Sequence, residues 1–113
     1  SDDMIISGGY NIWPSELEQV IAHHPDIIEV AVFGIPHPKW GETPLALCMV
    51  RSGHQVTETE IIERVAEELG SYKKPAKVIF QTEPLMRSAV GKIKRKAMRE
   101  PYWATHDTRV AGS

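Results

Sequence analysis

The residues best suited to chemistry on an anion are concentrated late in the chain. Six of the thirteen Lys and Arg residues lie between Arg87 and Arg99, and none of the fifteen Asp and Glu residues does. Gly91 directly precedes Lys92, so a flexible turn could present the Lys92 ammonium at its tip. An ammonium is a mobile point charge that suits phosphate and carboxylate oxygens. From these residues alone, an anion-binding lysine and an ordinary solvated lysine both remain open.

Other kinds of active site find little support in the sequence. The five histidines form no i, i+4 pair and no H-E-x-x-H pattern, and the single cysteine, Cys48, lies in an apolar run. We therefore expect no metal site. No G-x-S-x-G nucleophile motif occurs. Ser7-Gly8-Gly9 is shorter than the loops that cradle nucleotide phosphates, so on its own it indicates only a turn. The single cysteine also excludes an internal disulfide and is compatible with a reducing, cytoplasmic location.

The elements that must position these residues can be predicted from apolar periodicity and turn signals. The 113 residues, 42% of them hydrophobic, fit one compact domain with a small core. No apolar run of about 18 residues occurs, so we expect no membrane span. The pattern predicts an α+β fold, a small three-stranded sheet with flanking helices, preceded by a short N-terminal strand or hairpin. The predicted strands are 4–6, 27–33, 45–50 and 77–82. Two helices are predicted to begin near residues 14 and 57, and a third is predicted near the end of the basic segment 92–99.

Two segments are expected to lack regular structure. Residues 36–42 contain two prolines and predict a rigid loop, because proline suits neither a helix interior nor a central strand. Residues 102–113 are polar and without periodicity, and after Pro101 they predict a loosely held tail.

Four segments in a fixed order resemble one known family. Asp2–Glu18, Gly34–Glu42, Tyr72-Lys73-Lys74-Pro75 and Arg87–Arg95 are similar to motifs in the C-terminal domain of the adenylate-forming (AMP-dependent) acyl-CoA synthetase superfamily. The resemblance covers about residues 2–100. It implies a mobile C-terminal domain at 1–100, followed by a C-terminal tail at 101–113.

The resemblance implies an ATP-dependent carboxylic acid–CoA ligase, which forms an acyl-adenylate and then a thioester. A fatty or aryl acid is the expected substrate, with ATP (as its Mg²⁺ complex) and CoA. The expected partner is the protein's own N-terminal adenylation domain, against which the small domain rotates between the two half-reactions. That domain holds the main ATP and acyl pockets, so the chain alone is expected to be inactive.

The resemblance also implies roles for individual residues. Lys92 matches the catalytic lysine that bridges the acyl carboxylate and the α-phosphate during adenylation. Asp2 matches the hinge, and Gly9 matches the glycine that leaves room for the pantetheine thiol. Tyr72 and Lys74 align with positions that contact the CoA nucleotide.

Two positions near Lys92 depart from the family pattern, and one other function stays open. Met86 stands where proline is usual, and Val90 where a polar or small residue is usual. The alternative function is a free-standing module that binds nucleic acid or another anion through residues 87–99. The acidic remainder of the chain and the lack of a nucleic-acid motif count against this alternative.

Overall fold

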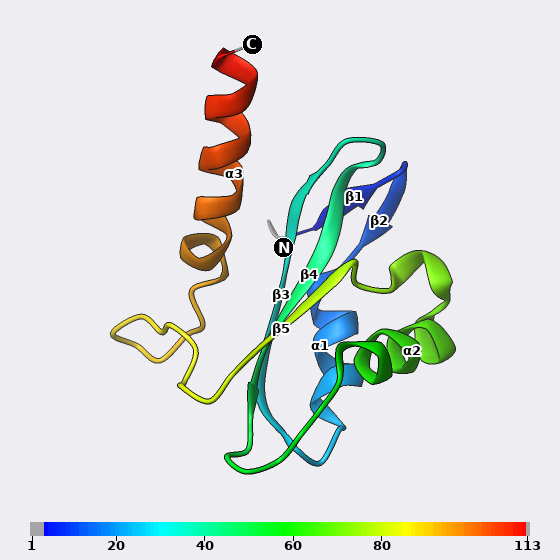
Figure 1. Cartoon of the computed structure of the whole chain (residues 1–113), viewed down its shortest axis with the longest axis vertical. Helices are drawn as coiled ribbons and strands as arrows, with labels where there is room; N and C mark the ends of the chain where they lie inside the picture. Colours follow the sequence, from blue (N-terminus) through cyan, green and yellow to red (C-terminus); the bar gives the residue numbers. More distant parts are fainter. Residues whose placement is uncertain (1–3, 113) are drawn as a thin grey trace.

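The computed structural model describes the backbone of residues 4–112 and the side chains of residues 4–106 (Figure 1). One mixed sheet carries helices on its surface, so the predicted α+β class is confirmed. The strands are β1 (Ile5–Ser7), β2 (Tyr10–Ile12), β3 (Ile27–His37), β4 (Gly41–Val50) and β5 (Lys77–Gln81). The helices are α1 (Pro14–Ala22), α2 (Glu58–Leu69), the short 3₁₀ helix η1 (Ser71–Lys73) and α3 (Arg95–Gly112).

Strand β4 organises the sheet because it has neighbours on both edges. Strand β3 pairs antiparallel with one edge of β4, from Ile27 opposite Val50 to His37 opposite Gly41. On the other edge, β5 runs parallel to β4 over residues 45–49, and β1 reaches it only where Ser7 pairs with Gly41. The predicted hairpin is β1–β2, and it extends the expected three-stranded sheet to five strands. A space remains on this edge of β4 between β1 and residues 71–76, which lead into β5.

The rigid loop predicted for residues 36–42 is wrong. Strand β3 continues through Pro36, which pairs with Glu42, and only residues 38–40 form the turn. The His37 ring closes this turn, because its Nδ1 accepts from the N–H groups of Lys39 and Trp40 at 3.1 Å. A proline removes only its own N–H donor, so a strand tolerates it where no ladder bond needs that donor. The long hairpin carries Trp40 to the β1–β2 turn, where the Gly8 N–H donates to the Trp40 carbonyl at 3.0 Å.

Helices α1 and α2 form the packed layer that buries the sheet. Leu17 and Ile21 of α1 and Ile61 and Val65 of α2 are fully buried in one cluster with residues of β3 and β4. Helix α2 begins at the predicted capping box, in which the Thr57 hydroxyl accepts from the backbone of residue 60 at 3.2 Å. The apolar periodicity that predicted both helices is therefore the pattern that packs the core.

Helix α3 covers β3, which corrects the loosely held tail expected after Pro101. The helix continues across Pro101, and Trp103 Nε1 donates to the Gly34 carbonyl at 2.8 Å. Tyr102 packs on Phe33, with ring centroids 5.9 Å apart. These contacts protect a strand that otherwise lies at the edge of the sheet. The division between a domain at 1–100 and a tail at 101–113 stays a prediction. Within residues 4–112, no helix combines the length and apolar character needed to cross a bilayer.

Candidate functional site

Lys92 lies in a tight loop between β5 and α3. Arg87 and Ile93 form an antiparallel bridge at the base of the loop. Inside it, the Ser88 N–H donates to the Lys92 carbonyl at 2.8 Å, and the Gly91 N–H donates to the Ser88 carbonyl at 2.9 Å. The Lys92 N–H in turn donates to Ser88 Oγ at 3.3 Å. The flexible stretch expected from the sequence is therefore a braced turn, closed by its own backbone and by Ser88.

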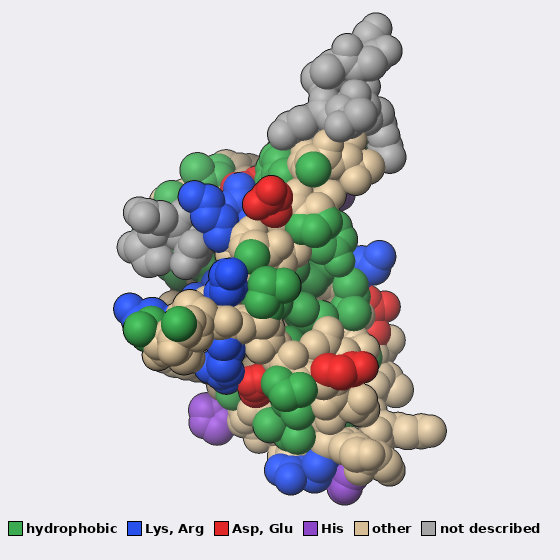
Figure 2. Space-filling model, turned by 90° about the vertical axis from the view of Figure 1, so that its left-hand side faces the viewer, with side chains coloured by type: hydrophobic (Ala, Val, Ile, Leu, Met, Phe, Trp, Pro, Cys, Tyr) green, Lys and Arg blue, Asp and Glu red, His purple; other side chains and the backbone are tan. Residues whose placement is uncertain are grey.

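The tip of this loop exposes a cation beside an apolar side chain. Gly91 adopts φ +86°, which disfavours any residue with a Cβ. Lys92 is exposed, and within residues 4–106 no carboxylate forms an ion pair with it. Val90 is 81% exposed. Figure 2 shows several Lys and Arg side chains on the face that carries the loop and α3. The loop thus presents an uncommitted ammonium to solvent.

A second candidate region is an apolar pocket of about 330 Å³. It lies at the edge of β4, between the β1–β2 hairpin and residues 71–76, which lead into β5. The Tyr10 and Tyr72 rings meet there with centroids 4.8 Å apart, and Trp40 contributes a third aromatic side chain. The complete lining is Ser7, Gly8, Tyr10, Trp40, Thr43, Ser71, Tyr72, Lys74, Pro75 and Ala76.

The structure brings most of the predicted CoA residues to this pocket. Tyr72 and Lys74 line it. Gly9 lies at the adjoining hairpin turn with φ +86°, and a Cβ built there would meet nothing within 4 Å. A side chain at this position would therefore project into open space beside the pocket. Asp2, the predicted hinge, lies outside the described residues.

Sequence reasoning missed Tyr10 and Trp40 as residues of this pocket. Both are exposed aromatic side chains, at 58% and 47%, and a contiguous exposed apolar patch is typical of a ligand or partner site. The available signal was their position directly after Gly9 and directly before Gly41. Because the two residues are 30 positions apart, only the folded hairpins show that they share a pocket.

Lys74 lines the pocket, whereas Lys73 points away from it and contacts α1. Its Nζ lies 2.7 Å from Glu16 Oε1 and 5.5 Å from the centre of the Tyr72 ring. The hydrogen bond to the Glu16 carboxylate raises the pKa of Lys73 above its ordinary value. This pair ties η1 to α1 and so holds Tyr72 in place.

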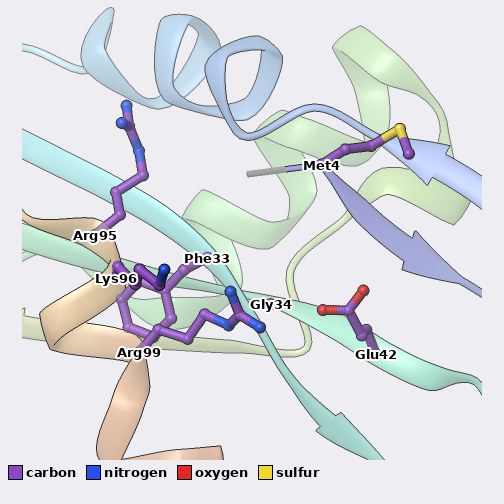
Figure 3. A pocket seen from close by; sticks show the side chains of 7 residues that line it. All are labelled: Met4, Phe33, Gly34, Glu42, Arg95, Lys96 and Arg99. Carbon is purple, nitrogen blue, oxygen red and sulfur yellow. The ribbon is translucent and has the colours of Figure 1, made fainter. Parts of the chain in front are cut away.

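A smaller cavity of about 130 Å³ lies where α3 meets the sheet. Figure 3 shows Arg99 pointing from α3 toward Glu42, whose Oε1 accepts from the Ile6 N–H at 2.9 Å. A Cβ on Gly34 would lie 2.6 Å from Glu42 Oε2, so a larger residue here would have to displace the Glu42 carboxylate. Met4 also lines the cavity, which therefore adjoins the start of the described chain.

The Lys92 loop and the aromatic pocket lie on different sides of one rigid sheet. Figure 1 shows the segment between β5 and α3, coloured yellow to orange, on the left of the molecule. The β1–β2 hairpin and η1 lie on the right, beyond β3 and β4. The two regions therefore face away from each other on the surface of the domain.

Among the side chains of residues 4–106, the buried cysteine and the possible metal ligands offer no further reaction centre. Burial raises the pKa of the Cys48 thiol to about 12, so this cysteine stays protonated and is a poor nucleophile. Among residues 4–106, no cluster of three or more His, Cys, Asp or Glu side chains could hold a metal ion.

Comparison with known proteins identifies the architecture that carries these two regions. Residues 16–92 match the model of the AMP-binding enzyme C-terminal domain. The chain belongs to this family. The match covers more than half of the chain and includes most of α1, the pocket residues Trp40, Tyr72 and Lys74, and Lys92.

The similar proteins include acid–CoA ligases of several kinds. The long-chain-fatty-acid–CoA ligase FadD13 of Mycobacterium tuberculosis is 47% identical over 103 residues, which are 91% of this chain and 20% of that protein. The 2-succinylbenzoate–CoA ligase of Bacillus cereus is 44% identical over 98 residues, covering 87% of this chain and 20% of the ligase. A solved Mycobacterium tuberculosis fatty acyl CoA synthetase superposes with a TM-score of 0.83 at 44% identity, over 92% of this chain and 20% of that one. The chain spans about a fifth of the length of these relatives.

Proposed function

We propose that the chain is the mobile domain of an ATP-dependent carboxylic acid–CoA ligase, in which it serves both half-reactions with different faces. One observation carries this proposal: an exposed, braced lysine and an aromatic pocket lie on different sides of one rigid domain. A rotation between two poses would present each in turn to a reaction centre on the N-terminal adenylation domain. Asp2 would be the hinge of that rotation.

In the adenylation pose, Lys92 would stabilise developing negative charge. A carboxylate oxygen of the acid attacks the α-phosphorus of ATP, a new O–P bond forms, and the bond to pyrophosphate breaks. The Lys92 ammonium would bridge the carboxylate and the α-phosphate, where charge accumulates in the transition state. Lys92 acts here as a charge and not as a base, which suits an exposed ammonium on a short, ordered loop.

In the thioester-forming pose, the aromatic pocket would guide CoA. The CoA thiol releases its proton to solvent, the thiolate sulfur attacks the acyl carbonyl carbon of the adenylate, a C–S bond forms, and AMP leaves with the electrons of the broken C–O bond. Tyr10, Trp40 and Tyr72 offer flat apolar surfaces for the pantetheine arm and the adenine ring. Lys74 would attract a CoA phosphate. Gly9 would leave the thiol a path, because no side chain occupies the space beside its turn.

The substrate class and setting belong to the same proposal. The relatives named above act on a long-chain fatty acid and on 2-succinylbenzoate, which supports a fatty or aryl acid. Mg²⁺ would accompany ATP as part of the nucleotide substrate. The buried thiol of Cys48 is compatible with a reducing, cytoplasmic location.

The experiment that tests this function compares the isolated chain with the ligase that carries it. The ligase should catalyse ATP–pyrophosphate exchange that depends on an added fatty or aryl acid, and should form the thioester when CoA is added. The isolated chain should do neither. Acid-dependent exchange by the isolated chain, or its absence from the ligase across both acid classes, would contradict the proposal.

Two ion pairs within the chain count against the alternative function of binding nucleic acid. Arg87 is paired with Glu29 and Arg95 with Glu18, so neither is free to neutralise a phosphate backbone. Retention on immobilised DNA that falls steeply with added salt would favour this alternative.

A further inference from the structure

The loop that presents Lys92 is attached to the rest of the domain through Arg87. The Arg87 guanidinium uses both terminal nitrogens: Nη2 contacts Glu29 Oε2 at 2.6 Å, and Nη1 donates to the Gly91 carbonyl at 2.9 Å. Gly91 is the residue directly before Lys92. One planar side chain therefore connects a carboxylate on β3 to the peptide group that leads into the lysine.

Glu29 also holds the chain that leads into the loop. Its Oε1 accepts from the Leu85 N–H at 3.2 Å, while Oε2 faces Arg87. The Glu29 side chain is only 12% exposed and the Arg87 side chain is 43% exposed, so the pair is partly shielded from water. Leu85 itself is buried, which fixes this point of the chain against the core.

The far end of the loop has a separate anchor. Arg95 opens α3 and contacts Glu18 of α1, with Nε 2.7 Å from Oε2. The same Glu18 oxygen accepts from the Val32 N–H of β3 at 2.9 Å. The Lys94 N–H also donates to the Met86 carbonyl at 2.9 Å, so the segment between the two arginines is held at both ends.

We infer that Glu29, acting through Arg87, is a positioning residue for Lys92: the pair fixes the loop to the sheet so that the ammonium enters the reaction centre already oriented. This inference rests on the proposed role of Lys92 in adenylation. A charge that stabilises a transition state acts best when its position is set beforehand, because reorganisation then costs nothing during the reaction. A displacement of about 1 Å in such a group can cost about a hundredfold in rate.

The decisive variant is Glu29→Gln in the ligase that carries this chain. The amide keeps the size of the side chain and can still accept from the Leu85 N–H, but it lacks the charge that holds Arg87. Adenylation kcat, followed by pyrophosphate release, should fall about tenfold or more. Thioester formation from preformed acyl-adenylate should stay within about twofold, because that step does not use Lys92. The control is Glu67→Gln on the exposed face of α2, which should match the wild type in both steps.

Tryptic cleavage reports the loop's order independently of catalysis. Glu29→Gln retains every Lys and Arg, so cleavage sites are unchanged. Loss of one charge-assisted bond should raise the rate of cleavage at residues 87–94 about tenfold, since proteolysis follows the population of the open loop. Arg87→Lys keeps a charge near Glu29 but loses the planar fork, so it should lie between wild type and Glu29→Gln in both measurements.

The outcomes separate this inference from the proposed function. If Lys92→Ala abolishes adenylation while Glu29→Gln matches the wild type in adenylation and in loop cleavage, the inference fails and the proposed function stands. If Lys92→Ala leaves adenylation intact, the proposed function fails, and Glu29 has no lysine to position. Equal losses in both half-reactions with Glu29→Gln would show a general structural role and overturn the inference. If Glu29→Gln does not fold, the same criteria apply to Arg87→Lys, whose side chain is 43% exposed in the wild type.

Discussion

The Lys92 loop and the aromatic pocket differ in chemical character and in how they are held in place. The loop is polar, and arginine–carboxylate pairs and short backbone hydrogen bonds hold the segment that carries Lys92 in place. The pocket is largely apolar, and its walls are aromatic rings from three separate segments. A single charge must be placed accurately to stabilise a transition state, whereas a long flexible ligand needs surface to lie against. The difference indicates that the loop is built to fix the position of one charge, and that the pocket is built to offer contact area to a ligand.

The largest expected effect comes from removing the charge on the loop. Lys92→Ala should lower the adenylation rate about a hundred- to a thousandfold, the range for loss of one preorganised donor to a developing charge. Thioester formation from preformed acyl-adenylate should be nearly unaffected. Rapid-quench measurement of each half-reaction checks this. Comparable losses in both half-reactions would contradict the assignment of Lys92 to adenylation alone.

A side chain placed at the entrance to the pocket should produce the opposite pattern. Gly9→Leu puts a bulky group into the open space beside the hairpin turn and forces it into φ +86°. Thioester formation should fall about ten- to a hundredfold by misplacement of the thiol, with adenylation close to the wild-type rate. Gly53→Leu is the control for strain alone, because Gly53 has φ +82° and an equally open surrounding in a turn remote from both regions.

Loss of one pocket wall should have a smaller effect that appears in binding. Tyr72→Ala should raise the KM for CoA about tenfold, the scale expected for loss of one base-stacking ring. Tyr72→Phe retains the ring and should leave this KM nearly unchanged. Steady-state kinetics with varied CoA would decide the matter, and a KM for ATP that rose instead would assign Tyr72 to the other half-reaction.

The smallest effect should come from the pair that supports the pocket from behind. Lys73→Met removes the ion pair with Glu16 and should lower the free energy of unfolding by no more than about 1 kcal/mol. The pKa of Lys73 is raised above 10.5 in the folded state, so its contribution is complete below about pH 10.5 and is lost at higher pH.

Urea denaturation of the wild type and Lys73→Met at several pH values measures this. The difference between the two proteins should be constant near neutral pH and should shrink as the pH rises above 10.5. A difference that grew with pH would contradict the assignment of the pair.

The parts of this protein that depend on near neighbours in the sequence could be predicted. The capping box at Thr57, the proline at the first position of α1 and the Gly91-Lys92 turn are each specified within a few residues, where local sterics and hydrogen bonding decide the conformation. The resemblance of the motifs added the expected roles of Lys92, Gly9, Tyr72 and Lys74. The local pattern failed at residues 36–42, because pairing with β1 and β4 outweighed the low strand preference of proline.

Only the tertiary structure decided which distant residues meet. Arg87 and Glu29 are 58 positions apart, and Arg95 and Glu18 are 77 apart, so no periodicity could reveal either pair. The same holds for the Tyr10 and Tyr72 rings and for the contact of Trp103 with Gly34. Such contacts follow from sheet register and helix docking, which depend on burying the whole core at once. The sequence alone thus determined which chemical groups are available, and the fold determined which of them are held in place and on which side.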